Sequence, residues 1–163
     1  MELRKIYEYA LQREREGKRF FEEHAGRMGH AAAVGAFKML ADEEQKHIEF
    51  IQQQLDALDR KQPGDAAPGL KLQKEGFFSE RAAAELLERS VLEAMVADLP
   101  VLRTAYLIER DFAEFYASAA RQVQGPAREV LEMLARWETG HAELFKSIHD
   151  KAFEEYSGMA WGG

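Results

Sequence analysis

The chain has no cysteine and only 4 prolines among its 163 residues. The lack of cysteine excludes disulfides, thiolate catalysis and iron–sulfur clusters, and it also excludes a four-cysteine iron centre. Any metal ion that the chain binds must therefore be held by oxygen and nitrogen atoms. The scarcity of proline, which interrupts helices, is compatible with long helical segments.

The chain also lacks long apolar runs and a basic stripe. No segment approaches the roughly 18 apolar residues of a membrane helix, and Met1 to Lys5 lead directly into a charged amphipathic pattern without a signal-peptide core. We therefore expect a cytoplasmic protein that does not bind membranes. The net charge of −7 argues against a nucleic-acid partner, because phosphate binding requires clustered basic residues.

The composition that is present favours helices. Hydrophobic residues make up 46% of the chain and charged residues 31%, with Ala, Leu, Glu, Lys and Arg abundant. A chain of this length can bury a core of its own. We predict an all-α protein with a single domain that spans residues 1–163.

Apolar residues recur at intervals of three and four along four segments, as in amphipathic helices. The predicted helices cover residues 2–27, 31–60, 100–123 and 126–156. Gly26 and Gly29 separate the first two, and Gly125 with Pro126 separates the last two. The sequence thus predicts two helical hairpins, residues 2–60 and 100–157, which pack together as a four-helix bundle.

Residues 61–99 are predicted to connect the hairpins. Residues 61–79 are rich in proline and glycine and have the composition of a linker. Ser79 is a suitable N-cap for an extra helix that continues to Ala97. This helix either covers the bundle or is exchanged with a second chain; both arrangements remain open, and a homodimer is expected.

One pattern of glutamate and histidine occurs twice. The first copy comprises Glu14, Glu44 and His47, and the second comprises Glu109, Glu138 and His141. The neighbouring residues repeat as well: Ala10, Phe20 and Ala25 recur 95 positions later, and Met39, Leu40, Ala41 and Glu49 recur 94 positions later. Such a repeat, with four carboxylates and two imidazoles preserved, predicts a site for two metal ions.

The turns of the hairpins agree with this prediction. The midpoint between Glu14 and the centre of the Glu44 and His47 pair falls at Gly29 and His30, and the corresponding midpoint in the second copy falls next to Gly125. Residues equidistant from the turn of an antiparallel helix pair lie at the same height. Each hairpin is therefore expected to bring its first glutamate level with its own glutamate and histidine pair.

The chemistry of the six residues also favours metal binding. Residues three apart share a helix face, so Glu44 with His47, and Glu138 with His141, can each point at one ion. Four carboxylates on apolar stripes would be driven to take up protons without cations nearby. A glutamate from each of two helices and Glu-x-x-His from each of the other two is the ligand set of di-iron and di-manganese carboxylate sites.

The other candidate residues are interpreted differently. His24, His30 and His149 lack a glutamate three residues earlier and are interpreted as surface or helix-end residues. Tyr116 lies seven residues after Glu109, on the same helix face. Its two interpretations are core packing and a hydrogen bond from its phenol to a ligand carboxylate or a metal-bound oxygen.

At these residues the chain resembles the rubrerythrin branch of the ferritin-like superfamily. The resemblance is carried by the pattern A-x3-E-x6-F-F/Y-x3-A at 10–25 and 105–120, and by M-L-A-x2-E-x2-H at 39–47 and 133–141. It implies a ferritin-like bundle with a non-haem di-iron centre and hydrogen peroxide reduction as the leading activity. It also implies that Glu14, Glu44, His47, Glu109, Glu138 and His141 bind the two irons.

The chain departs from this family at two positions near the predicted ligands, and it also lacks one domain that rubrerythrins carry. Phe112 stands where rubrerythrins carry an additional glutamate, so that the six-ligand set is closer to that of bacterioferritins. Phe21 replaces a tyrosine common in the first helix, whereas Tyr116 retains its counterpart. Without cysteine there is no fused rubredoxin-type electron donor, and the reductant must come from another protein.

Three functions follow from this interpretation. The first is an oxidoreductase that reduces peroxide, in which Glu44 and Glu138 bridge two irons and Glu14 and Glu109 are terminal ligands; manganese or zinc could substitute for iron. The second is a ferroxidase that oxidises Fe(II) with oxygen or peroxide for storage. The third is a non-catalytic helical protein in which the ions only stabilise the bundle.

Overall fold

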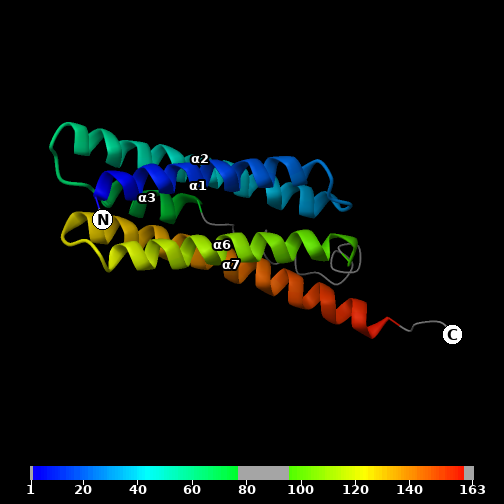
Figure 1. Ribbon diagram of the computed structural model, residues 1–163. Helices are drawn as coiled ribbons and strands as arrows, with labels where there is room; N and C mark the ends of the chain where they lie inside the picture. Colours follow the sequence, from blue (N-terminus) through cyan, green and yellow to red (C-terminus); the bar gives the residue numbers. More distant parts are fainter. Residues whose placement is uncertain (1, 77–95, 160–163) are drawn as a thin grey trace.

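The computed structural model describes residues 2–76 and 96–159, and these residues form helices and connecting turns without a β-strand. Four long helices make up the bundle: α1 (Leu3–Ala25), α2 (Ala31–Asp59), α6 (Leu99–Ala120) and α7 (Pro126–Gly158). Two helical hairpins, α1 with α2 and α6 with α7, lie side by side in Figure 1. The prediction of an all-α helical bundle is confirmed.

The helix ends follow the turn residues closely. Gly125 directly precedes α7 as its N-cap with a φ of +64°, a conformation that glycine adopts without steric cost, and Pro126 is the first residue of the helix. Because this turn needs residues 121–125, α6 ends at Ala120, three residues before the predicted end.

At the other end of the bundle, the amide of Gly29 donates to Oδ2 of Asp98 over 3.3 Å. This contact joins the turn of the first hairpin to the start of the second.

The prediction that residues 61–79 form a linker is wrong at residues 67–76, which form helix α3 (Ala67–Gly76). The amide of Ala67 donates to Oδ1 of Asp65 over 2.8 Å, and Pro68 follows in the first turn. Helix α3 contacts α2 and α7, and its Gly69 lies closely against Met133 and Phe50. The proline and glycine that suggested a linker thus serve to start and dock a short helix.

The extra helix predicted from Ser79 to Ala97 lies outside the described residues, except at its end. There, η1 (Val96–Asp98) forms a 3₁₀ turn that leads into α6. Among the described helices, none combines the length and the apolarity that a membrane span requires.

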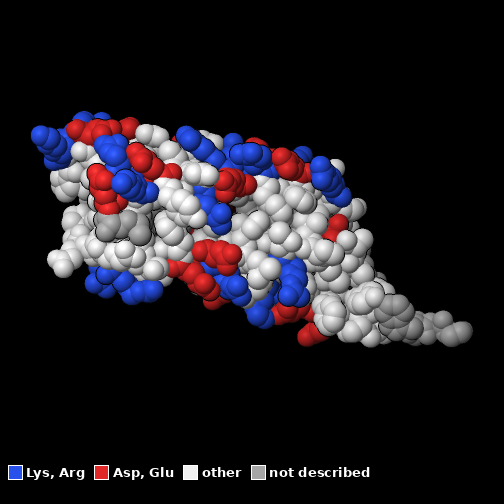
Figure 2. All heavy atoms as spheres, in the orientation of Figure 1, with Lys and Arg blue, Asp and Glu red and all other residues white. Residues whose placement is uncertain are grey.

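Two apolar clusters fill the bundle, one on each side of its middle. The first includes Ile6, Ile51, Tyr116 and Leu134, and the second includes Phe21, Leu40, Leu102 and Phe145. In each of the four long helices, the residues between the two clusters carry the predicted ligands. Charged residues of both signs are mixed on the face shown in Figure 2. The bundle therefore has a polar layer enclosed between two apolar ones.

Candidate metal centre

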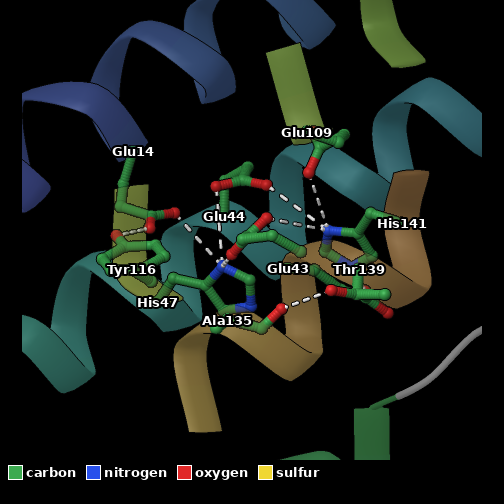
Figure 3. A network of polar contacts seen from close by, with 10 residues as sticks. Glu14, Glu43, Glu44, His47, Glu109, Tyr116, Ala135, Thr139 and His141 are labelled. Carbon is green, nitrogen blue, oxygen red and sulfur yellow. Dashed lines mark hydrogen bonds and ion pairs between the residues drawn. The ribbon is translucent and has the colours of Figure 1, made fainter. Parts of the chain in front are cut away.

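The six residues of the repeated pattern meet in this polar layer. Helices α1 and α6 each contribute one glutamate, and α2 and α7 each contribute a glutamate and a histidine. Figure 3 labels all of these residues except Glu138. The carboxylates of Glu14, Glu44, Glu109 and Glu138 are 0% exposed, and the two histidines are almost completely buried. The helical spacing of three residues directs both members of each Glu-x-x-His pair inward, as the sequence predicted.

Three carboxylates surround the ring of His47. Its Nδ1 atom lies 3.2 Å from Oε2 of Glu14, 3.6 Å from Oε2 of Glu44 and 3.0 Å from Oε1 of Glu138. The Nδ1 atom is therefore the ring nitrogen that faces the polar layer.

The Nδ1 atom of His141 has an equivalent environment. Its Nδ1 atom lies 3.2 Å from Oε2 of Glu109, 3.8 Å from Oε1 of Glu44 and 3.4 Å from Oε2 of Glu138. Glu44 and Glu138 thus approach both histidines, whereas Glu14 and Glu109 each approach one. The two rings are nearly parallel, with centroids 5.6 Å apart and planes inclined by 13°.

These side chains form two groups that could hold metal ions, within the part of the chain that the structure describes. One consists of Glu44, Glu109, Glu138 and His141, and the other consists of Glu14, Glu44 and His47. Within each group the potential ligand atoms lie within 4.8 Å of one another, and Glu44 belongs to both groups. Although Glu138 is assigned to the first group alone, its 3.0 Å approach to His47 places it beside both histidines.

Several oxygens in this layer make no hydrogen bond of acceptable geometry to a described residue, even where an imidazole nitrogen lies nearby, as Nδ1 of His47 does beside Oε1 of Glu138. They are both carboxylate oxygens of Glu44, both of Glu138, and Oε1 of Glu109. A buried charged oxygen without a donor is costly, and proteins offset this cost with bound cations or protons. The chemistry of the donor set, four carboxylates and two imidazoles, fits divalent metal ions such as Fe(II) and Mn(II).

In the protein without metal, protons would have to offset the charge. Burial, followed by the charges of Glu14 and Glu138, raises the pKa of Glu44 well above its usual range. Burial and the charge of Glu138 raise the pKa of Glu109 to about 8. For Glu138 burial acts in the same direction, but the two histidines outweigh it and lower its pKa.

The histidines respond in the opposite sense. Burial disfavours their charged forms, but the surrounding carboxylates outweigh it and raise the pKa of His47 and of His141 well above the usual value. Without a metal ion, these shifts favour the protonated forms of Glu44, Glu109 and both imidazoles. Divalent ions would replace these protons.

Tyr116 contributes a hydrogen bond to the layer. Its phenol donates to Oε1 of Glu14, and the side chain is 1% exposed. Burial and the charge of Glu14 raise the pKa of Tyr116 well above its usual value, so the phenol keeps its proton. Both interpretations of Tyr116 hold in the structure, because the phenol donates to a candidate ligand and the ring belongs to the apolar core.

Phe112 lies on α6 opposite Gly17 of α1, close to Glu44. A Cβ atom added at Gly17 would lie 3.2 Å from Cε2 of Phe112 and 3.8 Å from Cδ of Glu44. Gly17 and Phe112 are themselves related by the 95-residue repeat. The large ring of Phe112 on α6 therefore occupies space that a side chain at position 17 on α1 would need. The guanidinium of Arg13 covers this ring, 4.8 Å from its centroid.

The three remaining histidines are not members of either group. His24 Nδ1 lies 2.8 Å from the backbone oxygen of Phe20, and His149 Nδ1 lies 3.1 Å from Oδ1 of Asp150. His30 lies at the turn before α2. Within the described ranges, the structure therefore gathers the same six residues that the sequence singled out.

The sequence did not single out Glu43, which is buried beside His141. Its Oε2 atom lies 2.8 Å from Nε2 of His141, on the side of the ring that faces away from the carboxylates. Trp137 was also not considered, although it stacks on His47 with ring centroids 4.6 Å apart. The sequence offered one signal for these two residues, which was the repeat itself. Glu43 and Trp137 occupy equivalent positions, 94 residues apart, and each directly precedes a predicted ligand.

Comparison with known proteins adds no relative to this description. No family model matches the chain, and no curated protein or solved structure matches it either. The likeness to rubrerythrins therefore rests on the repeated motifs alone. What the geometry itself supports is a helical bundle whose buried glutamates and histidines could bind metal ions.

Proposed function

We propose that the six residues form a di-iron centre and that the protein is an oxidoreductase of the rubrerythrin type. The observation that carries this proposal is the set of five buried carboxylate oxygens without hydrogen-bond partners on Glu44, Glu109 and Glu138. Two cations beside them would remove most of the cost of burying these charges. Manganese or zinc could take the place of iron in the same ligand set.

The contacts suggest how the residues divide the two ions between them. His47 with Glu14 would hold one ion, and His141 with Glu109 would hold the other. Glu44 and Glu138 lie near both imidazoles and would bridge the pair. This division matches the symmetry of the repeat, because each hairpin supplies one terminal glutamate, one bridging glutamate and one histidine.

The proposed reaction is the reduction of hydrogen peroxide, with electrons from an external donor protein. When bound, two Fe(II) ions supply two electrons together, so that the O–O bond can be cleaved without release of a one-electron radical. The apolar clusters on both sides of the layer, together with Phe112, keep bulk water away from the carboxylates. Tyr116 fixes Glu14 and holds a proton at its phenol oxygen.

A second candidate function is suggested by Phe112. The six-ligand set lacks the additional glutamate of rubrerythrins, and this brings it closer to that of bacterioferritins. A ferroxidase would use the same residues to oxidise Fe(II) as its substrate, with oxygen or peroxide, and would pass Fe(III) on. The two functions differ in the preferred oxidant and in the fate of the iron.

Anaerobic titration with Fe(II), followed by rapid mixing with peroxide or oxygen, tests this proposal. We expect about two irons per chain and a reaction that is much faster with peroxide than with oxygen. A faster reaction with oxygen and accumulation of ferric mineral would favour the ferroxidase. Tight binding of two ions without turnover by either oxidant would leave only a structural role. Unchanged metal binding in a variant with Glu138→Ala and His141→Ala would refute the metal centre.

Replacing Tyr116 tests the hydrogen bond to Glu14. In Tyr116→Phe, Oε1 of Glu14 loses its donor, and the affinity for the ion beside His47 should fall by roughly 10-fold, which is typical for loss of an outer ligand partner. Calorimetric titration with Mn(II) would measure the change. Tyr9→Phe is the matched control, because Tyr9 is 46% exposed. Equal affinities in the two variants would contradict a role for the phenol.

A further inference from the structure

The two halves of the site differ at one pair of equivalent positions. Glu43 and Trp137 are 94 residues apart, and each directly precedes a bridging glutamate, Glu44 or Glu138. Each side chain reaches across to the histidine of the opposite hairpin. Glu43 contacts His141, and Trp137 stacks on His47. The repeat therefore places a carboxylate behind one histidine and an indole behind the other.

Glu43 is positioned to accept a hydrogen bond from His141. The Nδ1 atom of this ring faces Glu109 and the bridging carboxylates, which leaves the ring proton on Nε2 when Nδ1 binds a metal. The Nε2 to Oε2 distance of 2.8 Å is that of a charge-assisted hydrogen bond, and Glu43 is only 7% exposed. Such a carboxylate fixes the ring and makes its other nitrogen a stronger metal ligand.

Trp137 provides packing to His47 in place of this hydrogen bond. The two rings are inclined by only 15°, and Trp137 is 2% exposed. An indole has one N–H group and no acceptor, so it cannot take the proton of an imidazole. Its Nε1 atom has no hydrogen-bond partner within the described part of the chain. The indole holds the His47 ring in place without increasing its strength as a ligand.

Apart from the hydrogen bond that Tyr116 donates to Glu14, the carboxylates that face the two imidazoles are alike. Each Nδ1 atom is approached by one terminal glutamate and by both Glu44 and Glu138, at distances between 3.0 and 3.8 Å. The environment behind each ring is therefore the principal difference between the two histidines.

We propose that the two metal positions are unequal, and that the ion beside His141 binds first and more tightly because Glu43 supports that histidine. This inference rests on the proposed di-metal centre and makes Glu43 a positioning residue. Outer-shell partners of histidine ligands contribute about 10- to 100-fold in affinity, and we expect a difference of this size. The centre would consequently fill in two steps.

Titration with Zn(II), followed by NMR of isotope-labelled histidine nitrogens, measures the order of filling at each ring. The resonances of His47 and His141 are assigned with the variants His47→Gln and His141→Gln. We expect Nδ1 of His141 to reach its metal-bound position during the first equivalent and Nδ1 of His47 during the second. Parallel changes at both rings, or filling of the His47 position first, would overturn the proposal.

Variants at position 43 test the cause of the inequality. Glu43→Leu removes the acceptor and should weaken the first binding step by roughly 10- to 100-fold, so that both histidines respond together. Asp42→Leu is the matched control, because it removes the charge of an exposed neighbour on the same helix and should preserve the order. An unchanged order in a folded Glu43→Leu variant would overturn the role of Glu43. If wild-type protein bound no Zn(II), the metal centre itself would be refuted, whereas equal affinities would refute only this inference.

Discussion

Replacing Glu138 with glutamine is expected to weaken the binding of both metal ions by more than about 100-fold, which exceeds the usual effect of losing an outer-shell partner. The carboxylate lies 3.0 Å from Nδ1 of His47 and 3.4 Å from Nδ1 of His141, and as a bridging ligand it would serve both ions. Glutamine keeps the size of the side chain but removes the charge. Anaerobic titrations with Fe(II) or Mn(II) would measure both binding steps, and peroxide reduction should be lost with them.

Two further variants make this result specific. Glu143→Gln removes an exposed carboxylate from the same helix and should leave both binding steps unchanged. Glu109→Gln removes a proposed terminal ligand and should weaken mainly the binding of the ion beside His141, because Glu109 approaches that histidine alone. If Glu138→Gln bound two ions as wild-type protein does, the assignment of Glu138 as a bridging ligand would be wrong.

The second large effect concerns stability as a function of pH. Burial and Glu138 raise the pKa of Glu109 from 4.5 to about 8, and the pKa values of Glu44, His47 and His141 are also raised. Between pH 4.5 and about pH 8, the folded, metal-free protein holds a proton on Glu109 that the unfolded chain releases. Its free energy of unfolding should therefore fall as the pH rises, by on the order of 4 kcal/mol from Glu109 alone.

Glu138 does not reverse this trend. Its pKa is lowered, so its stabilising contribution is complete above its usual pKa of 4.5 and is lost only below it. Metal ions, by contrast, replace the protons and bind more strongly as the pH rises. At a free concentration about 1,000 times the dissociation constant, each ion would add roughly 4 kcal/mol. The metal-loaded protein should thus gain most where the metal-free protein is weakest.

Urea denaturation at about pH 5 and about pH 8, with chelator or with Mn(II), would measure both effects across the window set by Glu109. In Glu109→Gln without metal, the decrease in stability with pH should be smaller, because one of the titrating groups is absent. A metal-free protein that became more stable between these pH values would contradict the assigned protonation states. A stability that did not respond to Mn(II) would contradict the metal centre.

The helices and the candidate ligands could be predicted from the sequence because both depend on local spacing. A period of three to four residues fixes which side chains share a helix face, and the turn residues Gly29 and Gly125 fix where each hairpin reverses. The height of Glu14 relative to Glu44, and of Glu109 relative to Glu138, then follows from the geometry of antiparallel helices. Helix α3 was missed because Pro68 and Gly69 read as linker residues until the packing against Met133 is known.

The sequence by itself thus determined a helical bundle with six candidate metal ligands in its middle layer, because periodicity and internal repetition are properties of the chain. Only the tertiary structure decided what lies behind each histidine. Glu43 and Trp137 act on residues of the opposite hairpin, 98 and 90 positions away along the chain, and no local pattern encodes which ring they meet. Their contacts arise when the two hairpins pack, and this packing makes the two halves of a repeated pattern chemically different.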